Sequence, residues 1–234
     1  MALRTWGRVL VTALGVAAVA GAGQLGVAYG LGILRLARPF VDGAERLWPG
    51  QLAWVAFIAI VSAVAGGLAG DRAASSPGAP RTAGGRAAIA VAAWLGAALV
   101  APLCMHPARA AEFATAADPV LTVGLTAGLG ALAGALAGAL VPGHRAVLAS
   151  MAAVVGGAWA VALVSIAPSL GPRDAPRTVR LAVLDLPALS PGTSGTLALI
   201  GIPALALLAG AAVAAWGRAG GTRQPPTVAA AGAA

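Results

Sequence analysis

The stretch that decides the fold is residues 119–143, PVLTVGLTAGLGALAGALAGALVPG, which contains no charged residue. A bilayer core roughly 30 Å thick is crossed by about 20 apolar residues of helix. Inside lipid, every backbone N–H and C=O must be hydrogen-bonded within the segment or in a closed barrel. Barrel strands would alternate in polarity over roughly ten residues, and this stretch does not alternate. It is therefore predicted to be a transmembrane helix.

Five more charge-free apolar runs share this character, and all 22 Arg, Asp and Glu residues fall outside the six. The other runs are Val9–Leu34, Gly50–Gly70, Ala87–Met105, Ala146–Pro172 and Leu186–Gly217. The predicted fold is an all-α polytopic transmembrane bundle of six helices. We expect the helices near 9–34, 51–70, 87–104, 120–141, 146–167 and 194–217.

The expected organisation is a single transmembrane domain over residues 1–217. Two segments rich in Gly, Pro, Ser and Ala cannot form a core. They are predicted to be a flexible cytoplasmic loop at 71–85 and a disordered tail at 218–234.

The composition excludes a soluble domain, because 59% of the chain is hydrophobic and only 9% is charged, against about 25% charged in soluble domains. The net charge of +8 comes entirely from Arg. Basic residues at helix ends anchor to headgroups and set orientation, so no nucleic-acid partner is expected. The absence of Lys and Asn beside abundant Ala, Gly and Pro indicates a high-GC bacterial genome, and hence the bacterial plasma membrane.

The N-terminus sets the predicted orientation. Arg4 and Arg8 precede an apolar core and an Ala18-Val19-Ala20 sequence, as in a secretory signal. The run continues to Leu34, beyond the roughly 7–15 residues of a signal core, which favours an uncleaved first span and leaves cleavage as the alternative. Either alternative puts the N-terminus in the cytoplasm. Loop Arg residues divide almost evenly between the two sides, so the signal-like start decides for cytoplasmic N- and C-termini.

Small residues at steps of four predict close helix packing, since they let backbones approach in lipid. We expect lipid, other membrane subunits or a second copy of the chain as partners. The helix near 120–141 is the expected centre of the bundle, although its partner helix is left open. The predicted packing residues are Ala18, Ala22, Gly26, Gly30, Gly66, Gly70, Gly130, Gly134 and Gly138.

Four polar side chains within the spans are candidate contacts for a neutral solute: Gln24, Tyr29, Thr122 and Thr126. A buried amide in lipid is costly unless it is hydrogen-bonded. Gln24 is therefore expected to face another helix or a cavity. The alternative to a solute contact is an interhelical hydrogen bond, and the sequence favours it.

Cys104, Met105 and His106 carry the side chains that suit a soft metal such as Cu(I). Consecutive residues of a helix diverge by about 100°, so the three converge only where the helix has ended. No second cluster completes a coordination shell. The expectation is no metal and no other cofactor, with these three as the weak candidates.

Gly192-Thr193-Ser194-Gly195 resembles the GxSG pattern of rhomboid intramembrane proteases. The resemblance covers only these four residues, and it implies a serine nucleophile at Ser194. A serine nucleophile needs a base, and no His follows Ser194. Capping of the helix N-terminus by Ser or Thr is the simpler explanation of the motif.

A cluster of three arginines, Arg173, Arg177 and Arg180, lies in the longest predicted outer loop. It is a candidate contact for an anionic lipid or an acidic partner. The alternative is a solvated loop with local ion pairs to Asp174 and Asp185.

The spans carry no charged residue for proton relay or ion coupling, and the chain has no phosphate-binding loop for ATP. We therefore expect no enzyme. The first functional hypothesis is a membrane subunit of a transport or cell-envelope assembly, and the second is a facilitator or substrate-binding component for a small neutral or amphipathic solute. A distant third is an intramembrane enzyme using the outer-loop carboxylates Asp42, Glu45, Glu112 and Asp118.

Overall fold

The computed structural model describes residues 2–41, 44–75, 82–113, 118–140 and 145–167, together with 179–181, 183–184, 204, 208, 211 and 215. The chain divides into two compact units, Met1–Val141 and Pro142–Ala234. We call them unit 1 and unit 2.

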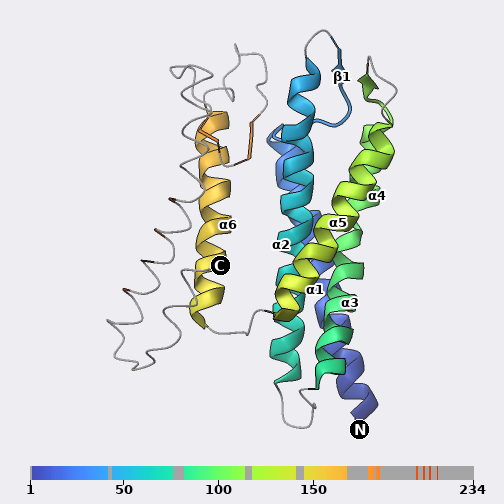
Figure 1. The fold of residues 1–234 in the computed structure, drawn as a ribbon, viewed down its shortest axis with the longest axis vertical. Coiled ribbons are helices and arrows are strands. Elements are labelled where there is room, and N and C mark those ends of the chain that lie inside the picture. The colour runs from blue at the N-terminus through green and yellow to red at the C-terminus, as the bar shows by residue number, and fades with distance from the viewer. Residues whose placement is uncertain are drawn as a thin grey trace. The chain divides into compact units, whose positions relative to one another are not determined.

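Unit 1 contains four helical segments of membrane length, drawn from blue to lime in Figure 1. They are α1 (Ala2–Gly30), α2 (Trp48–Ala74), the consecutive pair α3 (Ala83–Ala98) and α4 (Val100–Ala108), and α5 (Pro119–Leu140). The loops at one end add β1 (Pro39–Phe40), η1 (Ala44–Leu47) and β2 (Glu112–Phe113). Unit 2 contributes α6 (Arg145–Ile166).

The described part of the chain is all-helical apart from two short strands and the loops, and five of its helices are long and apolar enough to cross a membrane. It is a multi-pass membrane protein. The six-helix count is not reproduced among the described residues. The predicted helix at 194–217 lies outside them, except for residues 204, 208, 211 and 215, which are helical.

The first helix ends at Gly30, four residues before the end of its apolar run, and it begins at Ala2 rather than at residue 9. Gly32 has a φ of +68°, in the left-handed region that glycine adopts without steric cost. The N–H groups of Ile33 and Leu34 both donate to the carbonyl of Ala28, at 2.8 and 3.0 Å, which closes the helix end. The last apolar residues of the run therefore form a buried loop.

The third span is broken at Leu99, between α3 and α4. Pro102 explains the break, because a proline lacks an N–H and its ring collides with the carbonyl four residues earlier. That carbonyl belongs to Ala98, the last residue of α3. The span predicted at 87–104 therefore extends over Ala83–Ala108 in the structure and is interrupted at Leu99.

The cytoplasmic loop expected at 71–85 is shorter in the structure. Helix α2 continues through Asp71 and Arg72 to Ala74, and α3 begins at Ala83 behind the N-cap residue Thr82. The Thr82 side chain accepts a hydrogen bond from the Gly85 N–H at 3.1 Å. This capping bond satisfies one of the free donors at the helix start, so the helix can begin earlier than its charge-free run.

Helix α2, and not α5, is the centre of unit 1, because it packs against α1, α3 and α5. Within unit 1 this differs from the prediction that the helix near 120–141 is the centre of the bundle. Helix α5 exposes a full row of large side chains, such as Leu121, Leu125 and Leu129, on the face away from α2. This face of α5 is therefore open within unit 1.

Small residues occupy many of the buried helix contacts of unit 1, beside larger buried side chains such as Trp54 and Ile58. Ala13, Ala17, Ala59, Ala63 and Ala131 have no exposed surface. Large leucine and valine side chains, by contrast, lie on the outer faces of α1, α3 and α5. Lipid supplies no hydrophobic force between helices, so close contact between small residues replaces it.

Candidate functional site

Gly130, Gly134 and Gly138 form a row on α5, the α5 ladder, that packs against the backbone of α2. A Cβ added at Gly134 would lie 2.8 Å from the Ile60 Cα, and one added at Gly130 would lie 3.1 Å from the Ala56 carbonyl oxygen. Gly138 lies farther away, where an added Cβ would be 3.6 Å from the Val64 Cα. The partner left open by the sequence is thus a helix of the same chain.

Gly66 and Gly70 form the corresponding ladder of α2, which packs in the same way against α1 and α3. A Cβ at Gly66 would lie 2.5 Å from the Ala13 carbonyl oxygen. A Cβ at Gly70 would lie 2.7 Å from the Ile89 Cγ2. Gly96 of α3, which the sequence analysis did not single out, makes a similar approach, since an added Cβ would lie 2.9 Å from the Ala17 Cβ.

The ladder of α1 is different, because nothing lies within 4 Å of the position a Cβ would take at Gly26 or Gly30. Ala22, Gly26 and Gly30 are exposed, and Ala18 is half-buried. Helix α1 instead packs through the neighbouring row that includes Ala13 and Ala17. We call Ala18, Ala22, Gly26 and Gly30 the α1 ladder; it is a free surface of the described structure.

Gln24 lies between α1 and α2. Its Nε2 donates to the Ala20 carbonyl at 3.2 Å and to the Ser62 Oγ at 3.5 Å. Ser62 is fully buried and donates to the Ile58 carbonyl at 2.6 Å. The Gln24 amide therefore makes an interhelical hydrogen bond, at the long end of the range.

The other three candidate solute contacts do not converge with Gln24. Thr122 and Thr126 lie on α5, where their hydroxyls donate to the Asp118 and Thr122 carbonyls at 2.8 and 2.7 Å. The Tyr29 hydroxyl is buried beside the Cys104 thiol, and within the described residues it makes no hydrogen bond of ordinary geometry. None of the four lines the groove between α3 and α5.

Cys104, Met105 and His106 point in three directions from α4. Cys104 is buried beside Tyr29 of α1. The Met105 sulfur packs against α5, where it would lie 3.0 Å from a Cβ at Gly124, and His106 is exposed. The described residues contain no group of three His, Cys, Asp or Glu placed to hold a metal ion.

A buried amide that the sequence analysis missed, Gln51, holds the loop after α1. It is 1% exposed, its Oε1 accepts the Arg35 N–H at 2.6 Å, and its Nε2 donates to the Ile33 carbonyl at 3.3 Å. The Arg35 Nε also donates to the Gly32 carbonyl at 2.9 Å. Burial, and to a lesser extent the nearby Arg38, lowers the pKa of the Arg35 guanidinium from its ordinary value. Because Gln51 binds backbone groups, which every residue carries, its partners cannot be predicted from a pattern of side chains.

Three aromatic rings close the same end of unit 1. The Phe40 ring stacks on Phe113 at 5.2 Å, and Trp48 meets both rings edge-on at 4.9 Å. Strands β1 and β2 pair in parallel beside them, with Phe40 opposite Phe113. The Arg38 guanidinium lies 5.4 Å above the Phe40 ring, a cation–π distance. These contacts join the loop after α1 to the loop after α4.

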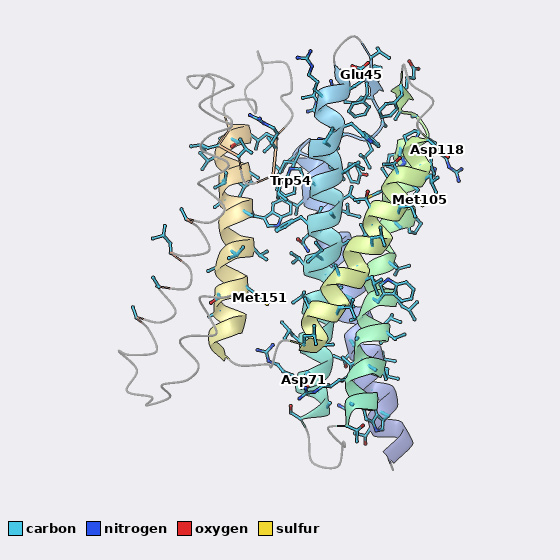
Figure 2. The ribbon with its side chains drawn as sticks, viewed as in Figure 1. Glu45, Trp54, Asp71, Met105, Asp118 and Met151 are labelled. Atoms are coloured by element: carbon cyan, nitrogen blue, oxygen red, sulfur yellow. The ribbon has the colours of Figure 1, made fainter. Side chains whose placement is uncertain are left out.

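The described carboxylates lie at the ends of the helices. Figure 2 places Glu45 and Asp118 at one end of unit 1 and Asp71 at the other. The Asp118 side chain caps α5 by accepting the Val120 and Leu121 N–H groups at 2.9 and 3.2 Å. Glu112 is exposed beside the paired strands. Asp42 lies outside the described residues.

Most of the predicted third outer loop also lies outside the described residues, including Arg173 and Arg177, and so does Ser194. Arg180 is half-buried, beside the buried Val179. Within unit 2, Ser165 of α6 donates to the Val183 carbonyl at 3.1 Å.

Comparison of the chain with known protein families, with curated proteins and with solved structures finds no match.

Proposed function

We propose that this protein is a membrane subunit of a transport or cell-envelope assembly in a bacterial plasma membrane, without catalytic chemistry of its own. Its N-terminus lies in the cytoplasm, and it docks through the α1 ladder. The observation that carries the proposal is that nothing lies within 4 Å of an added Cβ at Gly26 or Gly30. The glycines that do lie against neighbouring helices of unit 1 include Gly66, Gly70, Gly96, Gly130 and Gly134.

The comparison with α5 supports the proposal. A helix face that meets only lipid gains nothing from glycine, and the outer face of α5 accordingly presents Leu121, Leu125, Leu129 and Leu136. The second half of α1 presents Ala22, Gly26 and Gly30, with Val27 as the large exposed side chain among them. Small residues in lipid allow close backbone approach, so this face is suited to another helix.

The interior of unit 1 supports the part of the proposal that gives the protein no catalytic chemistry of its own. The polar groups of Gln24, Ser62 and Gln51 are occupied by hydrogen bonds between helices or to loop backbone. They are therefore structural contacts in the described part of the chain, and they are not gathered on one path through the membrane.

The test is photo-crosslinking of the full chain in native membranes. A benzophenone is attached to Gly26→Cys in a Cys104→Ala background, and to the lipid-facing Leu125→Cys as the matched control. We expect a discrete protein adduct of higher mass from position 26, and lipid adducts from position 125. Mass spectrometry of the adduct then identifies the partner helix.

Two outcomes would reject the proposal. One is an adduct pattern at position 26 that matches the lipid-facing control. The other is a link from position 26 to residues 145–234 of the same chain, which would show that the protein covers the ladder itself.

A further inference from the structure

An open groove runs between the first part of α3 and the last part of α5, with a volume of about 610 Å³. This lies within the roughly 300–1,000 Å³ of small-molecule sites. On α3 it is lined by Ala83, Ala87, Ala90 and Trp94, and on α5 by Leu132, Ala135 and Leu136. Ala135 forms the floor at 2% exposed, and Leu136 forms part of the rim at 54% exposed. The groove is apolar and opens outward from unit 1.

A positively charged side chain, Arg86, lies at the end of the groove nearest the start of α3. Arg86 lines it, is exposed, and makes no side-chain hydrogen bond or ion pair with any residue that the structure describes. The N-terminus of α3, with its free N–H groups, lies at the same end. A helix N-terminus carries a partial positive charge, so it adds to the field of the guanidinium. The groove is thus apolar along its length and positively charged at the end where Arg86 lies.

The length of the groove matches one leaflet of a bilayer. Eleven residues separate Ala83 from Trp94, or about 16 Å of helix at 1.5 Å per residue. Half of a hydrocarbon core roughly 30 Å thick is about 15 Å. Trp94 closes the inner end, because its Nε1 donates to the Gly128 carbonyl of α5 at 3.4 Å. A transmembrane helix of a partner would need a groove about twice as long.

We infer that this groove binds one anionic phospholipid, with an acyl chain between α3 and α5 and its phosphate on Arg86. The side-chain sizes support this placement, because the small residues 83, 87 and 90 leave the space that the chain fills. The Arg86 guanidinium presents a fork of N–H donors to phosphate oxygens. This inference is independent of the docking face on α1.

The test uses the full chain reconstituted into phosphatidylcholine vesicles that contain a series of brominated lipid fractions. Bromine on the middle of the acyl chain quenches the fluorescence of nearby tryptophan. The Trp94 component is taken as the difference between the wild type and Trp94→Phe. Brominated phosphatidylglycerol should quench this component at a roughly fivefold lower mole fraction than brominated phosphatidylcholine, the ratio expected for one basic residue acting on an anionic lipid.

The variants separate the groove from general attraction to the membrane surface. Arg86→Gln should abolish the preference for phosphatidylglycerol, and Arg86→Lys should retain most of it. Arg72→Gln, which removes an exposed arginine of α2 at the same end of unit 1, should leave the preference unchanged. Ala90→Leu should fill the groove and weaken quenching by both lipids.

Three results would overturn the inference. Equal quenching of Trp94 by the two lipids would remove the anionic preference. An equal effect of the changes at positions 72 and 86 would assign the preference to surface charge. No quenching by either lipid would show that protein, from this chain or a second copy, covers the groove.

Discussion

Replacement of Gly134 by alanine should destabilise the protein, because it separates α5 from α2. The added Cβ would lie 2.8 Å from the Ile60 Cα and still closer to the Ile60 carbonyl oxygen. Both neighbours are backbone atoms, so no side chain can rotate away and the helices must move apart. Overpacking of this kind costs about 1–3 kcal/mol. That cost is partly offset by the higher helix propensity of alanine, about 1 kcal/mol over glycine.

The matched control is Gly128→Ala on the same helix, where nothing lies within 4 Å of the added Cβ. The two variants gain the same helix propensity, so their difference isolates the clash and should be about 1–3 kcal/mol. The assay is unfolding of the purified full chain in mixed micelles with increasing dodecyl sulfate, followed by circular dichroism. Equal stability of the two alanine variants would refute the close approach of α5 to α2.

Two further predictions concern the amides and the orientation. Gln51→Leu leaves the buried Ile33 carbonyl and the partly buried Arg35 N–H without a partner, at up to about 1–3 kcal/mol each. Gln24→Leu should cost only about 0.6 kcal/mol, the average for polar contacts between transmembrane helices. Similar losses for the two variants in the same unfolding assay would contradict the role of Gln51 in holding the loop after α1. In a Cys104→Ala background, a membrane-impermeant maleimide added to intact cells should label Glu112→Cys but not Ser75→Cys, and the reverse pattern would reject a cytoplasmic N-terminus.

The sequence predicts the helices of this protein well because the lipid requirement is simple. A charge-free run of sufficient length has to be helical, and the helices near 120–141 and 146–167 end within one residue of their predicted bounds. The errors lie where a run's length does not determine its conformation. Gly32 ends α1 inside an apolar run, and Pro102 interrupts the third span, so in both places local backbone geometry prevails over hydrophobicity.

The packing of the helices is less predictable, because Ala and Gly occur on every face. Helix α1 carries two rows of small residues, one through Ala13 and Ala17 and one through Gly26 and Gly30. The glycines drew attention to the second row, yet the first is the one packed within unit 1. The loop clamp by Gln51 was missed for a related reason, since its partners are backbone groups that every sequence contains.

The covered contacts have a common form that explains which row is used. At Gly66 the opposing group is the Ala13 carbonyl oxygen of α1, and at Gly134 it is backbone of Ile60 on α2. In each pair, one helix supplies a glycine and the other supplies backbone flanked by ordinary apolar residues. Within unit 1 the packed side of α1 meets glycines of α2 and α3 through Ala13 and Ala17, and it supplies one buried glycine of its own, Gly21, against Ser62 and Val100. By the same rule, a helix that docks on Gly26 would resemble the surface that α2 turns toward α5, where Ala56, Ile60 and Val64 lie opposite the glycines.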